Sequence, residues 1–181
     1  ANYFDIKETA TLSSARIQLY LNSFDTSLGS FETTSGGEVI FYLCDTTGIL
    51  DPAVESLDMD LGGVLWESDY IMIQEWMLDE GFVSVEIPEI ELNPNAYYIV
   101  VEMYSNGLES DILINDDTSV AQPWFASLVF YPNDQAWYSN PNAASIRIGL
   151  DGNTHLSEND LHGIDFFPNP AKNFIEVSSE Q

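Results

Sequence analysis

Apolar and polar residues alternate with a period of two along most of this chain, the pattern expected of strands with one buried face. The alternation predicts strands over residues 1–6, 14–22, 37–45, 81–89, 110–116, 125–132 and 144–152. Residues 96–105 are apolar on both faces, which predicts a central strand covered from two sides. Residues 69–78 fit a short helix and a strand equally well, because Ile73, Trp76 and Met77 would share one helical face.

Short segments rich in Gly, Asn, Asp and Pro separate these strands and predict tight turns. Many short strands joined by frequent turns indicate an all-β fold, and we expect an antiparallel β-sandwich of Greek-key or jelly-roll type over residues 1–152. Residues 153–163 are polar and lack strand periodicity, so they are predicted to form a linker. Residues 164–181 are then predicted to begin a further domain, of which we expect only the start in this sequence.

The segment after the linker has two prolines that flank an asparagine, followed by the strand-like residues Phe174, Ile175 and Val177. The motif is Phe167, Pro168, Asn169, Pro170 and Ala171. It resembles the beginning of the type A C-terminal sorting domain of the type IX secretion system of Bacteroidetes, although complete domains of this family have several more strands. The resemblance implies export by the type IX secretion machinery and an extracellular or outer-membrane-surface location. Sorting domains have no catalytic function, so the resemblance says nothing of activity.

The charge balance is extreme: four Lys and Arg residues against thirty Asp and Glu give a formal net charge of −26. Such a surface repels phosphate backbones, which argues against a nucleic-acid partner. Divalent cations and uncharged glycans are compatible with it, and so is a plain solubility role in a salty habitat. No apolar run reaches the ~18 residues of a membrane span, so the sequence predicts none.

Residues for nucleophilic catalysis are sparse. Cys44 lies in an apolar run and is expected to be a small buried hydrophobe. The histidines, His155 and His162, both fall in the predicted linker, and no nucleophile-elbow motif is present. Among so many acids, a pair at glycosidase spacing would arise by chance. Glu102 and Arg147 lie inside predicted strands, and we interpret them as a core ion pair with a structural role.

Acidic loops supply the candidate metal ligands. Calcium prefers carboxylate and carbonyl oxygens of such loops, whereas zinc would need more Cys or His ligands than this chain offers. No cofactor is required by the sequence, and calcium is the metal it suggests. Turn formation and solvation explain the same loops without a metal. The candidate ligands are Asp58, Asp60, Asp116, Asp117 and Asp151.

Aromatic residues near predicted loops are candidates for sugar binding, because apolar ring faces stack on sugar rings. Trp124, Trp137 and Tyr138 are the candidates. The alternative is that they fill the core, as we expect of Trp66 and Trp76.

These observations together favour a non-catalytic extracellular or cell-surface module that acts in adhesion, glycan binding or surface assembly. An N-terminal strand over residues 1–8 could pair with a neighbouring molecule and drive such assembly. Two alternatives remain open: a small secreted hydrolase with two catalytic carboxylates, and an accessory module of a larger secreted protease or glycanase.

Overall fold

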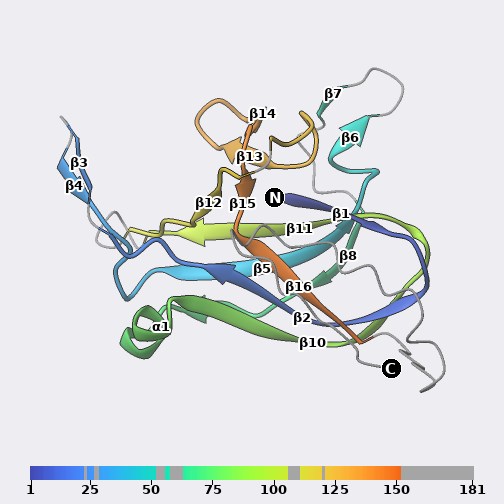
Figure 1. The fold of residues 1–181 in the computed structure, drawn as a ribbon, viewed down its shortest axis with the longest axis horizontal. Helices are drawn as coiled ribbons and strands as arrows, with labels where there is room; N and C mark the ends of the chain where they lie inside the picture. Colours follow the sequence, from blue (N-terminus) through green and yellow to red (C-terminus); the bar gives the residue numbers. More distant parts are fainter. Residues whose placement is uncertain are drawn as a thin grey trace, which may run out of the picture.

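The computed structural model describes residues 1–22, 24–26, 29–51, 56–57, 63–105, 111–119 and 121–151. These residues form mostly strands and one short helix, α1 (Glu75–Glu80) (Figure 1). The strands are β1 (Asn2–Ile6), β2 (Ala10–Gln18), β3 (Phe24–Thr26), β4 (Gly29–Phe31), β5 (Glu38–Asp45), β6 (Leu50–Asp51), β7 (Ser56–Leu57), β8 (Val64–Glu67), β9 (Ile71–Met72), β10 (Phe82–Leu92), β11 (Asn95–Tyr104), β12 (Asp116–Asp117), β13 (Leu128–Tyr131), β14 (Ala136–Ser139), β15 (Ala143–Ala144) and β16 (Ile146–Asp151).

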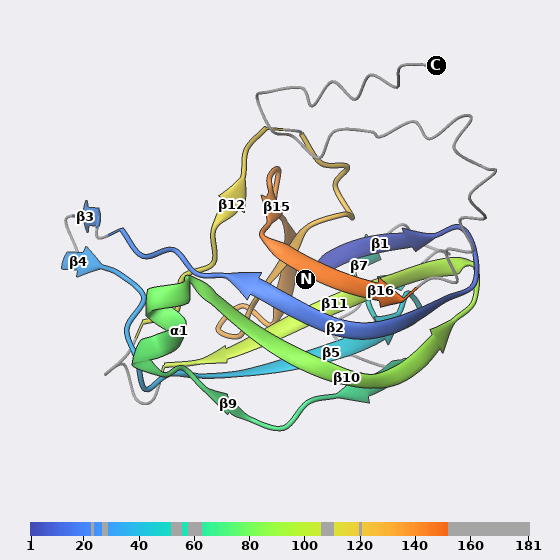
Figure 2. The same ribbon diagram turned by 60° about the horizontal axis from the view of Figure 1, so that its bottom comes forward.

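Two antiparallel sheets form the body of the protein. Sheet A has the strand order β1-β11-β5-β8, with β9 also paired to β5, and sheet B has the order β10-β2-β16. The two sheets stack face to face, with sheet B curving over sheet A (Figure 2). The prediction of an all-β antiparallel sandwich is therefore confirmed, and its Greek-key or jelly-roll subtype stays a prediction.

The main core fills the space between the two sheets. Alternate residues of each strand point into it, as the period-two pattern requires. Val39, Phe41 and Leu43 of β5 are at most 1% exposed, and they face Val83 and Ile87 of β10 within the same apolar cluster. The predicted inward faces of residues 37–45 and 81–89 are therefore confirmed.

A second apolar cluster lies on the outer face of sheet A. It consists of Cys44, Ile49, Tyr98, Val100 and Leu128. The β13–β14 hairpin covers this cluster, and Trp137 packs against it (Figure 1). Strand β11 is thus covered on both faces and paired on both edges, as a central strand is. Cys44 is fully buried, as predicted.

The ambiguous segment 69–78 contains both elements in succession. Strand β9 ends at Met72, and α1 follows, capped by Gly81 in a left-handed conformation (φ 77°). Met77 of α1 is buried and Trp76 is 55% exposed, whereas Ile73 lies before the helix and is buried between the two elements. The expectation that Trp76 lies in the core is therefore wrong. Trp66 is partly buried against the main core.

The predicted strand over residues 110–116 is largely wrong within the described residues. Only an isolated bridge from Ile114 to Leu19 and the short β12 form there. On one side Tyr20 N donates to Leu113 O over 2.8 Å, whereas on the other side Leu113 N donates to Thr33 Oγ1 over 3.1 Å. A threonine side chain therefore satisfies an amide that a second partner strand would otherwise pair.

The N-terminal strand is not a free edge along its whole length. One side of β1 pairs with β11, and on the other side Tyr3 N donates to Ala126 O and Leu128 N to Ala1 O. The first half of β1 is therefore already paired on both sides, which weakens the case for assembly through this strand.

Candidate functional site

The β13–β14 hairpin presents one aromatic face to the core and another to solvent. Phe130 pairs with Trp137 across the hairpin, and Val129 pairs with Tyr138. Because neighbouring residues of a strand point to opposite faces, the first pair turns toward sheet A and the second turns away. The rings of Phe130 and Trp137 pack 5.3 Å apart across the hairpin, and the packing of Trp137 on the outer cluster holds the hairpin on the sheet.

Tyr131 and Tyr138 form an exposed aromatic pair on the outer side of the hairpin. Their ring centroids lie 5.4 Å apart in an edge-to-face arrangement, and the two residues are 53% and 46% exposed. The Tyr138 hydroxyl donates to Asp134 Oδ2 over 3.1 Å, and this bond raises the pKa of Tyr138. The phenol thus stays neutral and in a fixed orientation at ordinary pH, which suits a binding surface.

Trp124 is a further exposed ring, anchored through a chain of aromatic contacts. It packs edge-on against Phe125 at 5.6 Å, Phe125 packs on Tyr3 at 5.1 Å, and Tyr3 packs on Tyr98 at 5.6 Å. The Tyr98 hydroxyl also donates to Phe125 O over 2.7 Å. The chain runs from the surface into the outer cluster, so Trp124 is held by contacts that reach the centre of sheet A.

The three predicted sugar-binding aromatics therefore separate into two groups. Trp124 and Tyr138 are exposed, whereas Trp137 is half-buried and turned toward sheet A. The indole Nε1 of Trp137 is buried and has no hydrogen-bond partner, so this residue serves packing. Sequence reasoning missed Tyr131, whose only signal was its position two residues from Val129 in the predicted strand.

Amides and a carboxylate cluster at the other end of β14. Asn140 Nδ2 donates to Asp116 Oδ1 over 3.2 Å, and Asn142 Nδ2 donates to Asp116 Oδ2 over 3.4 Å. Asn140 follows Tyr138 by two residues, directly after the end of β14. Sugar-binding surfaces combine apolar rings with a few such polar groups.

The predicted calcium ligands do not come together in the described residues. Asp116 bonds to the two asparagines, whereas Asp117 Oδ1 accepts hydrogen bonds from the Ser119 hydroxyl and amide, which lower the pKa of Asp117. Asp151 is the last residue of β16, whereas β15, which pairs with Asp116 and Asp117, comes just before the first residue of β16. A strand of six residues is roughly 20 Å long, so Asp151 is separated from the other two. Within the described part of the chain, no three His, Cys, Asp or Glu side chains are grouped as a metal site. Asp58 and Asp60 lie outside the described residues.

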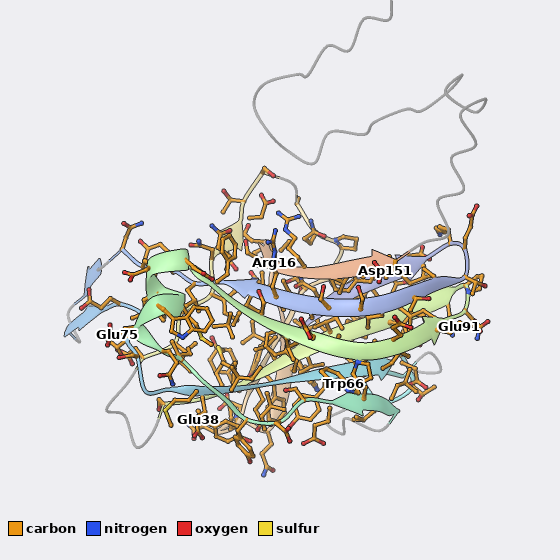
Figure 3. All side chains as sticks on the ribbon, turned by 90° about the horizontal axis from the view of Figure 1, so that it is seen from below. Arg16, Glu38, Trp66, Glu75, Glu91 and Asp151 are labelled. Atoms are coloured by element: carbon orange, nitrogen blue, oxygen red, sulfur yellow. The ribbon has the colours of Figure 1, made fainter. Side chains whose placement is uncertain are left out.

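The predicted Glu102–Arg147 ion pair is wrong. Glu102 points outward from sheet A, and its Oε2 accepts a hydrogen bond from the Tyr42 hydroxyl at 2.7 Å. Tyr104 also bonds to this carboxylate, and the bond raises the pKa of Tyr104. Arg147 is exposed on the outer face of sheet B, on the side away from the core. It lies directly opposite Arg16, which Figure 3 labels. Alternation along β11 and β16 placed the two side chains on the outer faces of different sheets.

Comparisons with family models, curated proteins and solved structures give no match to this chain. The predicted sorting motif and both predicted segments after residue 152 lie outside the described residues. Of the helices in the described part, none is long and apolar enough to cross a membrane.

Proposed function

We propose that this chain is a non-catalytic β-sandwich module that binds neutral glycans at the cell surface. The binding surface is the aromatic face, which we define as Val129, Tyr131 and Tyr138 of the hairpin, and we include Trp124, the exposed ring of the loop before it, as a further contact. The observation that supports it is the exposed Tyr131–Tyr138 pair on a hairpin fixed to the sandwich. The same role is compatible with a stand-alone protein and with an accessory module of a larger secreted enzyme.

Two physical arguments favour sugar as the ligand. Exposed aromatic groups present apolar area that gains free energy when a sugar ring covers it, and each tyrosine also has a polar hydroxyl for hydrogen bonding. The net charge of −26 disfavours polyanions but leaves uncharged glycans unaffected.

A binding assay with matched aromatic variants tests this proposal. The probes are soluble neutral polysaccharides, such as a β-glucan, a xylan and a mannan, in affinity electrophoresis. We expect one of them to retard the wild type, and Tyr138→Ala and Trp124→Ala to weaken binding about tenfold, the loss expected when one stacked ring is removed.

The matched control is Tyr70→Ala. Tyr70 is 62% exposed and lies 5.8 Å from Tyr104 in another exposed tyrosine pair, away from the hairpin. Glycan binding that survives the hairpin variants but not the control would transfer the site to that pair. Absence of binding to every probe would overturn the proposal.

We also propose that the chain is exported by the type IX route, on the resemblance of residues 164–181 to a sorting domain. The test is expression in a Bacteroidetes host with this system, followed by fractionation. We expect the intact chain at the cell surface or in the medium, and a chain ending at residue 163 in the periplasm. Surface delivery of the shortened chain would contradict the proposal.

A further inference from the structure

Two arginines lie side by side on the outer face of sheet B. Arg16 of β2 is directly opposite Arg147 of β16, and both side chains are exposed (Figure 3 labels Arg16 beside the start of β16). They are two of only four Lys and Arg residues in a chain with thirty acids. Like charges directly opposite each other on neighbouring strands destabilise a sheet, and the chain has ample carboxylates to place there instead. The pairing therefore calls for a reason other than stability.

The arginines line a shallow groove of about 340 Å³ over the paired strands β2 and β16. This volume falls within the range of small-ligand sites, ~300–1,000 Å³. Gly149 forms part of its lining, and a Cβ at that position would overlap the hydroxyl of Ser14. Glycine therefore keeps the space beside the arginines open. The lining residues are Ser14, Ala15, Arg16, Arg147, Ile148 and Gly149.

Each guanidinium group is held by its surroundings. The Arg16 guanidinium lies over the Phe82 ring, 4.9 Å from the centroid, which limits its motion without neutralising it. Among the residues that the structure describes, no carboxylate forms a salt bridge with Arg16. Arg147 has the Asp117 carboxylate nearby, and its charge adds to the Ser119 hydrogen bonds that lower the pKa of Asp117. The groove thus contains one charge without a carboxylate partner in the described chain, that of Arg16, and one that interacts with Asp117, that of Arg147.

We propose that this groove binds the carboxylate of an acidic sugar residue, such as a uronate in a glycan. Guanidinium groups recognise carboxylates through paired, planar hydrogen bonds, and the Ser14 hydroxyl adds a donor and acceptor for a ring hydroxyl. The two arginines are the positive charges of the groove. They suit one acidic sugar residue rather than a long chain of them. Two acids border the groove, because Glu86 of β10 lies opposite Ser14 and Asp117 lies near Arg147. At physiological salt the Debye length is about 8 Å, which screens the acids beyond these two. This inference is independent of the proposed neutral-glycan surface, which lies on the hairpin over sheet A.

The test uses trigalacturonate in isothermal titration calorimetry near physiological salt. Its methyl ester, which has the same rings without charge, is the ligand control. We expect the wild type to bind the acid and not the ester, and binding to weaken about ten- to a hundredfold in Arg16→Gln and Arg147→Gln, because each substitution removes a charged hydrogen-bond donor.

Lys7→Gln is the matched protein control. It changes the net charge by the same amount, but Lys7 lies on the surface in a salt bridge with Asp5. Thermal midpoints of all variants establish that they fold. The double variant Arg16→Lys, Arg147→Lys keeps both charges but removes the planar guanidinium groups. Equal loss in Lys7→Gln, equal binding of the ester, or no binding of the acid by the wild type would each overturn the proposal. Tyr138→Ala should leave binding of the acid in the arginine groove unchanged. The groove proposal and the neutral-glycan proposal can therefore fail independently.

Discussion

The hydroxyl of Tyr98 joins the centre of sheet A to the loop before the hairpin, because it donates a hydrogen bond to Phe125 O, 2.7 Å away. The Tyr98 side chain is fully buried, and burial raises its pKa, so the phenol remains a donor. This single bond therefore couples the central strand to the segment that positions Trp124.

Tyr98→Phe should lower the free energy of unfolding by about 1–2 kcal/mol, since it leaves a carbonyl without its partner. Tyr97→Phe is the matched control, because its hydroxyl donates to Asn93 O over 3.1 Å at an exposed residue that water can reach. Urea denaturation of both variants measures the difference. Equal losses would show that the Tyr98 bond has no special structural role.

Trp137→Ala should destabilise the protein by roughly 2–4 kcal/mol, because it removes the ring that packs the hairpin onto the outer cluster. Tyr138→Ala, one residue further along β14, should cost less than about 1 kcal/mol, since its ring is half exposed. Thermal and urea unfolding give both values. The reverse order would mean that the two rings have exchanged roles.

Two glycines with similar backbone angles should respond differently to substitution. Gly63 has φ 81° and Gly81 has φ 77°, so alanine strains both. A Cβ at Gly63 would also overlap Asp45 Oδ1, whereas at Gly81 its nearest neighbour, Leu21 Cδ1, is 3.7 Å away. We expect losses of roughly 2–4 kcal/mol for Gly63→Ala and roughly 1–2 kcal/mol for Gly81→Ala. Similar losses would show that Asp45 moves aside freely.

The protein should lose stability in alkaline solution. Burial raises the pKa of Cys44 from 9.0 to about 12, and it also raises the pKa values of Tyr98 and Tyr42. The folded state therefore holds these protons more tightly than the unfolded state does. Their contribution is fully present below about pH 9 and is lost as pH rises from about 9 toward 12.

Urea midpoints between pH 7.5 and 10.5 measure this alkaline loss. Cys44→Ala should have a shallower decline than the wild type, because one of the raised groups is gone. The native thiol should also resist iodoacetamide at pH 8 and react once the protein is unfolded. A stability that stays constant to pH 10.5 would contradict the expectation.

The arginine pair should be mutually repulsive in a double-mutant cycle. The Arg16→Gln, Arg147→Gln double variant is expected to be less stable than the sum of the single effects by about 0.2–1 kcal/mol, since each single substitution relieves the same repulsion. The coupling should shrink as salt increases. Arg16→Gln combined with Lys7→Gln should be additive, and an attractive coupling between the arginines would contradict the structural pairing.

The strands that form the centre of the fold were predictable because their signal is local. Val39, Phe41 and Leu43 occupy alternate positions of one strand and so share its inward face. Residues 96–105 are apolar on both faces, which requires cover from both sides. Segment 110–116 has an equally good pattern, yet it bonds to the Thr33 hydroxyl rather than to a full partner strand. The pattern of one segment does not specify what lies beside it.

The candidate site was predicted in part for the same reason. Aromatic residues near predicted loops identified Trp124 and Tyr138, but neighbouring positions in β14 turned Trp137 inward and Tyr138 outward. Tyr131 joined the site only through its place across the hairpin from Ala136 and beside Tyr138. The direction of each ring depends on pairing register, which aromatic content does not encode.

The sequence by itself determined the β-rich class, the central strand, the burial of Cys44 and the strongly acidic surface, because these follow from composition and from neighbours along the chain. The tertiary structure alone decided that Arg16 lies opposite Arg147, that Glu102 bonds to Tyr42, and that Tyr131 meets Tyr138. Register sets each of these contacts, and a shift of one residue would turn every side chain of a strand to the other face.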